Sequence, residues 1–117
     1  MKTTHNKLVR DNIISIIMDN CNKRGWFGTA EWQKLSHDEF KAALKDKLSE
    51  EVAEFLAAAD KKQQIEEMAD IIEVIFSIIC EFNLGIEEVL KKRKDKHREK
   101  GGFDKRTYLI SVEVTEQ

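Results

Sequence analysis

The chain has 117 residues, of which 41% are hydrophobic and 36% are charged, and its formal net charge is −2. This length is enough for one domain with a core, and this composition is typical of a protein whose helices carry charged outer faces. A net charge this close to zero gives no bulk attraction to a nucleic-acid polymer or an anionic membrane, so we expect neither partner.

The first half of the chain predicts two helices. Apolar residues recur at helical spacing through residues 8–23. Residues 24–35 contain glycines and tryptophans, which indicates an ordered loop. Ser36 followed by Glu39 forms a capping box, the signature of a helix start. A second helix is therefore expected over residues 36–59.

The second half predicts two more helices and a strand. Asp60 is placed to cap a third helix over residues 60–82, which Gly85 would end. A fourth helix, dense in Lys and Arg, is expected over residues 86–100. The tail, residues 107–114, is rich in β-branched residues and predicts a short C-terminal strand. The expected fold is all-α: a single domain that spans the chain, built as a helical bundle of about four helices.

Two pairs of acidic residues stand out on the second and third helices. Glu51 and Glu54 are spaced i, i+3, and so are Glu67 and Asp70, which places each pair on one helical face. The short connection predicts that the two helices pack antiparallel as a central αα-hairpin. That packing would gather four carboxylates, which repel one another unless a hard cation binds between them.

Glu67 occupies an unusual position for a carboxylate. Steps of about 100° per residue along the third helix place three apolar residues within roughly 40° of Glu67: Ile71, Val74 and Ile78. A carboxylate on an apolar face must be protonated, ion-paired or bound to a metal. A buried salt bridge to Lys or Arg is the structural alternative, but one basic side chain cannot balance four converging acids.

The chemistry of these four side chains narrows the choice of metal. All-oxygen ligation favours Mg²⁺ or Mn²⁺ over Ca²⁺. Zinc would require His or Cys, and a di-iron bundle site would require an E-x-x-H motif. Mg²⁺ binds a few carboxylates together with substrate phosphates, so this site indicates a phosphorylated substrate.

Basic residues near both ends of the chain support a phosphorylated substrate. The segment Lys91–Lys100 crowds the fourth helix, and Lys7 and Arg10 lie next to the first apolar run. Most of these side chains belong to a solvated face, but a few on one face would reach phosphates beside the metal. Neither cluster is specific by itself.

The cysteines and the apolar runs of the sequence indicate the cellular compartment of the protein. Two isolated cysteines, Cys21 and Cys80, give neither a disulfide framework nor a metal-binding spacing. The N-terminus lacks the apolar region of a signal peptide, and no apolar run approaches the length of about 18 residues that a membrane span needs. We expect a reduced, cytoplasmic protein.

The acidic pairs resemble a known family pattern. The sequences E-E-V-A-E (50–54) and E-M-A-D (67–70), separated by twelve residues, resemble the EExxE…ExxD signature of the MazG-like, all-α nucleoside triphosphate pyrophosphohydrolases. The sequences K-L-V-R-D-N-I (7–13) and K-G-G-F-D-K-R (100–106) resemble the ends of a small single-domain branch. That branch is phosphoribosyl-ATP pyrophosphohydrolase-like.

The resemblance implies Mg²⁺-dependent cleavage between the α- and β-phosphates of a nucleotide, which releases a nucleoside monophosphate and pyrophosphate, including house-cleaning of non-standard nucleotides. It also implies assembly as a homodimer or homotetramer. By residue match it implies that Glu50 orients or deprotonates the attacking water. The metal ligands by the same match are Glu51, Glu54, Glu67 and Asp70.

The resemblance further implies four side chains that hold phosphates: Lys7, Arg10, Arg93 and Lys96. The sequence departs from the pattern at two positions. Ile14 stands where the branch commonly has proline, and Lys100 stands where Arg is frequent before Gly-Gly-Phe. Neither departure removes a proposed metal ligand.

Two other interpretations remain open. In the first, the chain is a non-catalytic module that binds a nucleotide and a metal. In the second, it is a regulatory helical protein whose acidic residues form ion pairs with the basic fourth helix. The pattern does not distinguish among bases and sugars, so canonical nucleotides, damaged nucleotides and phosphoribosyl-ATP all remain candidate substrates.

Overall fold

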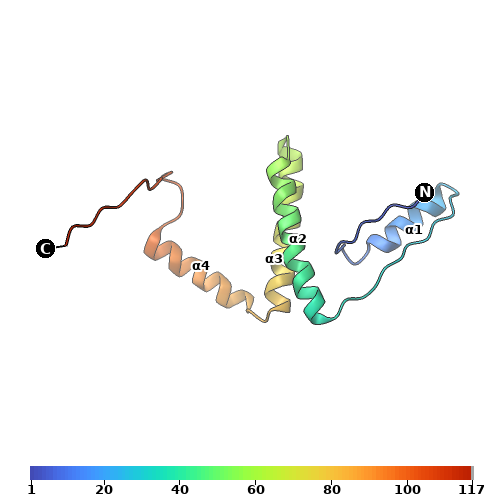
Figure 1. Ribbon diagram of the computed structural model, residues 1–117, viewed down its shortest axis with the longest axis horizontal. Coiled ribbons are helices and arrows are strands. Elements are labelled where there is room, and N and C mark those ends of the chain that lie inside the picture. Colours follow the sequence, from blue (N-terminus) through green and yellow to red (C-terminus); the bar gives the residue numbers. More distant parts are fainter. Residues whose placement is uncertain (117) are drawn as a thin grey trace. The chain divides into compact units, whose positions relative to one another are not determined.

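The computed structural model describes residues 1–116 and contains four helices (Figure 1). These are α1 (Ile13–Lys23), α2 (His37–Ala57), α3 (Lys61–Glu81) and α4 (Ile86–Lys100). The chain divides into two compact units, the first ending at Leu84 and the second beginning at Gly85. The all-α class is confirmed. Within the described residues, no helix combines the length and apolarity needed to cross a membrane.

The start of α2 is fixed by the capping box that the sequence predicts. The Ser36 hydroxyl accepts a hydrogen bond from the backbone N–H of Glu39 at 3.2 Å, and the Glu39 carboxylate accepts one from the backbone N–H of Ser36 at 3.1 Å. These two bonds satisfy amide groups that the helix itself leaves unpaired. The helix ends at Ala57 because Ala58 adopts an extended conformation.

The α2–α3 hairpin is the packed part of the first unit. Residues 58–60 connect the two helices, and the Asp60 carboxylate caps α3 by accepting a hydrogen bond from the Gln63 N–H at 2.8 Å. So short a connection returns the chain along α2, and the two helices lie side by side (Figure 1). The predicted αα-hairpin is therefore present. Within the described part of this unit, α1 packs against neither helix.

The hairpin buries few apolar side chains. Leu44 of α2 and Val74 and Ile79 of α3 are its buried apolar residues among those described. Other apolar residues of α3 remain exposed at spacings of three and four residues: Ile65, Met68, Ile72, Ile75 and Phe76. These five residues form an apolar stripe along one side of α3, here called the α3 stripe.

The first helix begins later than the sequence predicts. Helical spacing suggests a start near residue 8, whereas α1 begins at Ile13. The preceding segment is not helical, and its Lys7 and Arg10 side chains form ion pairs with acidic residues of the hairpin. Local periodicity cannot reveal these ion pairs, because their acidic partners lie far away in the sequence.

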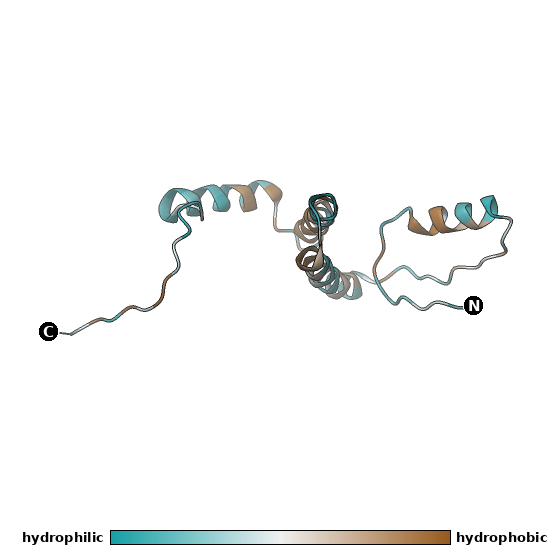
Figure 2. Cartoon of the chain, turned by 90° about the horizontal axis from the view of Figure 1, so that it is seen from above, coloured by the Kyte–Doolittle hydropathy of each residue, from teal (hydrophilic) through white to brown (hydrophobic). Residues whose placement is uncertain are grey.

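The second unit contains α4 and the tail. Gly85 and Gly101 flank the helix with φ values of 72° and 80°, a left-handed region that favours glycine. The helix is hydrophilic over most of its length (Figure 2). The expected C-terminal strand is a wrong prediction for the described residues, because 107–116 contain no strand. A strand needs hydrogen bonds from a neighbouring strand, and β-branched composition cannot supply that partner.

The burial of Leu44, which is 2% exposed, gives a prediction about stability. Leu44→Ala leaves a cavity between α2 and α3, and we expect the free energy of unfolding to fall by about 2–5 kcal/mol. Urea unfolding followed by circular dichroism measures this loss. The matched control is Leu109→Ala on the exposed tail, with an expected change below about 0.5 kcal/mol. Equal effects of the two variants would contradict this description of the core.

Candidate functional site

The hairpin brings three carboxylates together from its two helices. Glu51 and Glu54 lie on α2 and Glu67 lies on α3, and one oxygen atom from each lies within 4.8 Å of the others. The i, i+3 spacing on α2 and the antiparallel packing of α3 produce this convergence of three carboxylates, whereas the sequence predicts four. These three residues are called the acidic cluster below.

Two carboxylate oxygens of the acidic cluster are buried without a partner. Glu51 is 5% exposed, and neither Glu51 Oε2 nor Glu67 Oε2 has a hydrogen-bond partner among the described residues. A buried unpaired oxygen of a charged group is costly unless a cation or a proton satisfies it. Oxygen atoms from three carboxylates are also the donor set that Mg²⁺ and Mn²⁺ prefer, so these residues fit a hard divalent cation.

The proximity of these carboxylates changes the acidity of Glu67. The pKa of Glu67 is raised to about 7 by a hydrogen bond with Glu54, loss of hydration, a hydrogen bond with Glu51 and the negative charges of both neighbours, in that order of size. Near neutral pH, a proton therefore reduces the repulsion within the acidic cluster. A divalent cation competes with that proton for the same oxygen atoms.

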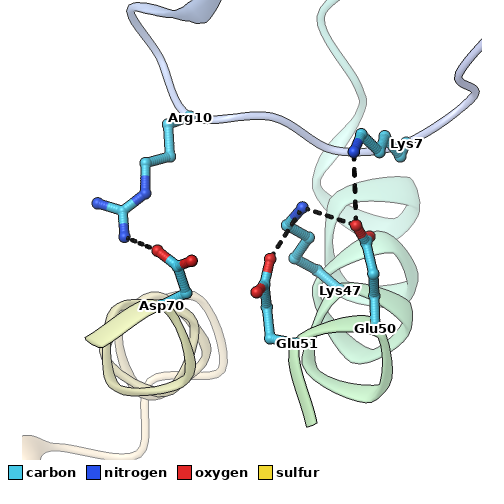
Figure 3. Close-up of polar contacts among 6 residues, drawn as sticks. All are labelled: Lys7, Arg10, Lys47, Glu50, Glu51 and Asp70. Atoms are coloured by element: carbon cyan, nitrogen blue, oxygen red, sulfur yellow. Dashed lines mark hydrogen bonds and ion pairs between the residues drawn. The ribbon is translucent and has the colours of Figure 1, made fainter. Parts of the chain in front are cut away.

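Asp70 lies outside the three-carboxylate group. Its Oδ1 atom accepts a hydrogen bond from Arg10 Nη2 at 2.7 Å, and both side chains are partly exposed (Figure 3). The structure thus brings three of the four predicted metal ligands together and places the fourth in an ion pair. Asp70 remains one helical turn from Glu67, on the side of the hairpin that the N-terminal segment covers.

Glu50 lies among lysine side chains. Its Oε1 atom is 3.6 Å from Lys7 Nζ and 3.3 Å from Lys47 Nζ, and Lys47 Nζ is also 3.2 Å from Glu51 Oε1 (Figure 3). Partial burial lowers the pKa of Lys47, but the hydrogen bonds and charges of Glu51 and Glu50 outweigh that effect and leave the pKa raised. Lys47 therefore stays protonated at neutral pH.

Sequence reasoning missed Lys47, although its signal is present. In the sequence K-L-S-E-E, Lys47 precedes Glu50 by three residues and Glu51 by four, which are the spacings of helical ion pairs. Such pairs are common on exposed helices and carry little weight there. The burial of Lys47 beside a buried glutamate distinguishes this pair, and only the packed hairpin reveals it.

The predicted phosphate-binding residues fall into both units. Lys7 and Arg10 of the first unit lie beside the acidic residues of the hairpin, as described above. Arg93 and Lys96 are exposed on α4 in the second unit. All four side chains retain at least partial exposure, which a group that binds a phosphate from solution requires.

Comparison with known proteins identifies one family. A family model described as phosphoribosyl-ATP pyrophosphohydrolase matches residues 24–97, which is more than half of the chain. The matched segment includes α2, α3 and the acidic cluster. Searches of curated proteins and of solved structures found no match.

The raised pKa of Glu67 predicts a pH dependence of stability. Without a divalent cation, the folded chain binds a proton that the unfolded chain releases, so the contribution of Glu67 to stability declines as pH rises from about 4.5 to about 7. Thermal unfolding in EDTA, compared with that of Glu67→Gln, isolates this contribution. The Tm of the wild type minus that of the variant should fall across this window.

Divalent cations provide the control for this pH dependence. Because a cation binds the ionised carboxylates, saturating Mg²⁺ should reduce the decline, and Mg²⁺ affinity should rise over the same pH window. A Tm difference that stays constant between about pH 4 and pH 8 would contradict the shared proton.

Proposed function

Because the chain belongs to the phosphoribosyl-ATP pyrophosphohydrolase family, a family of hydrolases that act on phosphoric anhydrides, we propose that it hydrolyses a nucleotide between the α- and β-phosphates. The products are a nucleoside monophosphate and pyrophosphate. The observation that carries this proposal is the pair of buried, unpartnered oxygens on Glu51 and Glu67, which suits a cation that also binds phosphate.

The proposed cofactor is Mg²⁺, with Mn²⁺ as a substitute. Glu51, Glu54 and Glu67 hold it through their converging oxygens, and Asp70 is the fourth proposed ligand, one turn along α3. When bound, the cation neutralises phosphate charge and lowers the pKa of a water molecule. The acidic cluster fixes the position of that chemistry at the contact between the two helices.

Glu50 is the proposed acceptor of the proton from the attacking water. It directly precedes Glu51 in sequence, and its Oε1 atom lies 3.6 Å from Lys7 Nζ and 3.3 Å from Lys47 Nζ. A base must lie within hydrogen-bond reach of the water that it deprotonates, directly or through one further water. The neighbouring position of Glu50 and Glu51 supports that role.

The basic side chains have the proposed role of binding phosphate. Lys7 and Arg10 lie next to the acidic residues, so either can contact a phosphate that shares the cation with the acidic cluster. Arg10 offers a planar, bidentate group that matches phosphate oxygens, whereas Lys7 offers a mobile point charge. Arg93 and Lys96 are the proposed contacts from α4.

The proposed substrate class is a nucleoside triphosphate or a related nucleotide such as phosphoribosyl-ATP, with removal of non-standard nucleotides as one role. Turnover of a panel of canonical, oxidised and deaminated triphosphates, together with phosphoribosyl-ATP, ranks these substrates. The product analysis must show pyrophosphate, because release of inorganic phosphate would indicate cleavage at a different anhydride bond.

We also propose that the chain assembles as a homodimer or homotetramer through the α3 stripe. Only three apolar side chains of the described residues are buried, while the five residues of the stripe remain exposed along one side of α3. An apolar stripe with spacings of three and four residues matches the seam that helices use to pack together. A second copy of the hairpin supplies a surface of the same kind.

The hydrolase proposal predicts a loss of activity in Glu67→Gln. This variant keeps the side-chain shape but removes a charged cation ligand, and we expect pyrophosphate release to fall by about 100-fold or more. The adjacent exposed Glu66→Gln is the matched control, with activity near that of the wild type. Circular dichroism establishes that both variants fold. Activity that persists in Glu67→Gln, or that is indifferent to EDTA, would exclude this assignment.

The assembly proposal predicts the effect of a charge in the α3 stripe. Ile72→Glu places a carboxylate at the centre of the stripe, and we expect the dimer or tetramer to dissociate to monomers. Light scattering coupled to size-exclusion chromatography measures the mass. Leu109→Glu adds the same charge to the exposed tail and should leave the mass unchanged. A wild-type chain that elutes as a monomer at micromolar concentration refutes the proposal.

A further inference from the structure

Lys47 lies beside the proposed cation ligands, although the reaction as proposed gives it no part. Its Nζ atom is 3.2 Å from Glu51 Oε1 and 3.3 Å from Glu50 Oε1 (Figure 3). Only 15% of its side chain is exposed, so water and salt screen these ion pairs less than they screen pairs on an open surface. In its low exposure, Lys47 therefore differs from the solvated lysines on the outer faces of the helices.

The two oxygens of Glu51 have different surroundings. Oε1 forms the ion pair with Lys47, whereas Oε2 is buried and has no hydrogen-bond partner among the described residues. A carboxylate that is held through one oxygen cannot rotate freely, so its other oxygen keeps a fixed direction. Groups that hold a metal ligand in this way orient the ligand and tune its affinity for the metal.

We propose that Lys47 is a positioning residue that fixes Glu51 for cation binding and holds Glu50 beside it for proton transfer. This inference rests on the proposed function, because it takes Glu51 as a cation ligand. Lys47 acts through these two glutamates and contacts neither cation nor nucleotide. Glu50 keeps a second cationic neighbour, because Lys7 Nζ lies 3.6 Å from its Oε1 atom. Removal of Lys47 should therefore change the orientation of Glu51 more than that of Glu50.

A positioning role and a simple charge effect predict opposite results. Lys47 carries a positive charge close to the acidic cluster, and that charge by itself repels a divalent cation. If charge were its only effect, removal of the ammonium group would strengthen cation binding. If Lys47 orients Glu51, its removal weakens cation binding, because the carboxylate must then be ordered when the cation binds.

The test is direct titration of the full chain with Mn²⁺ in the absence of nucleotide, followed by electron paramagnetic resonance. We expect Lys47→Met to weaken Mn²⁺ binding by about 10- to 100-fold, the range typical of groups that orient metal ligands. Lys47→Arg keeps the charge and the donors, and it should restore most of the affinity. The matched control is Lys45→Met: Lys45 is exposed on the same helix, over the ring of Phe82.

A double-mutant cycle establishes that Lys47 acts through Glu51. In a Glu51→Gln background, Lys47→Met should cause little further loss of Mn²⁺ affinity, because the carboxylate that it orients is already absent. Losses that simply add would overturn the inference. Should Lys47→Met fail to fold by circular dichroism, Lys47→Gln, which lacks both the charge and the reach, replaces it with the same expectation.

The outcomes separate this inference from the proposed function. Mn²⁺ affinity that is unchanged or increased in Lys47→Met, while the wild type binds Mn²⁺, overturns the role of Lys47 and leaves the hydrolase proposal standing. A wild-type chain that binds no Mn²⁺ overturns the cation site itself. Weakened binding in Lys47→Met, restored in Lys47→Arg and unaffected in Lys45→Met, supports the positioning role.

Discussion

The contact between α2 and α3 brings carboxylates so close together that their negative charges must be compensated. Glu51 and Glu67 each have a buried oxygen without a hydrogen-bond partner among the described residues, and a hydrogen bond with Glu54, loss of hydration and the neighbouring negative charges raise the pKa of Glu67. Three kinds of compensation are available: a shared proton, the ammonium group of Lys47, and a divalent cation. The proton and the ammonium group lower the electrostatic free energy of bringing the carboxylates together in the folded hairpin. A divalent cation does the same when it binds, so cation binding also stabilises the fold.

The helix ends determine whether this convergence occurs. Ser36 and Asp60 fix where α2 and α3 begin, and the short connection before Asp60 makes the helices antiparallel. With both starts fixed, the residues that face each other across the hairpin are determined by counting along the two helices. The acidic cluster is thus a consequence of two local capping signals and one short turn. Leu44 of α2 and Val74 of α3 are both buried in the packed hairpin.

Features that depend on residues close together in the sequence are predicted correctly, whereas features that depend on distant residues are not. Capping and periodicity are local, so they predict the starts of α2 and α3. Long-range contacts have no local signal: Arg10, in the non-helical segment before α1, forms an ion pair with Asp70, which lies outside the acidic cluster. The tail shows the same limit, because its β-branched residues cannot form a strand without a partner. Lys47 lies between these cases, since its spacing is visible in the sequence but its burial is not.

The central claim is that the hairpin carboxylates bind a divalent cation, and anomalous diffraction from crystals grown with Mn²⁺ tests it most directly. The account predicts a strong anomalous peak within bonding distance of oxygens from Glu51, Glu54 and Glu67. A peak at other acidic residues, or no peak at a Mn²⁺ concentration that saturates the chain in solution, would contradict it.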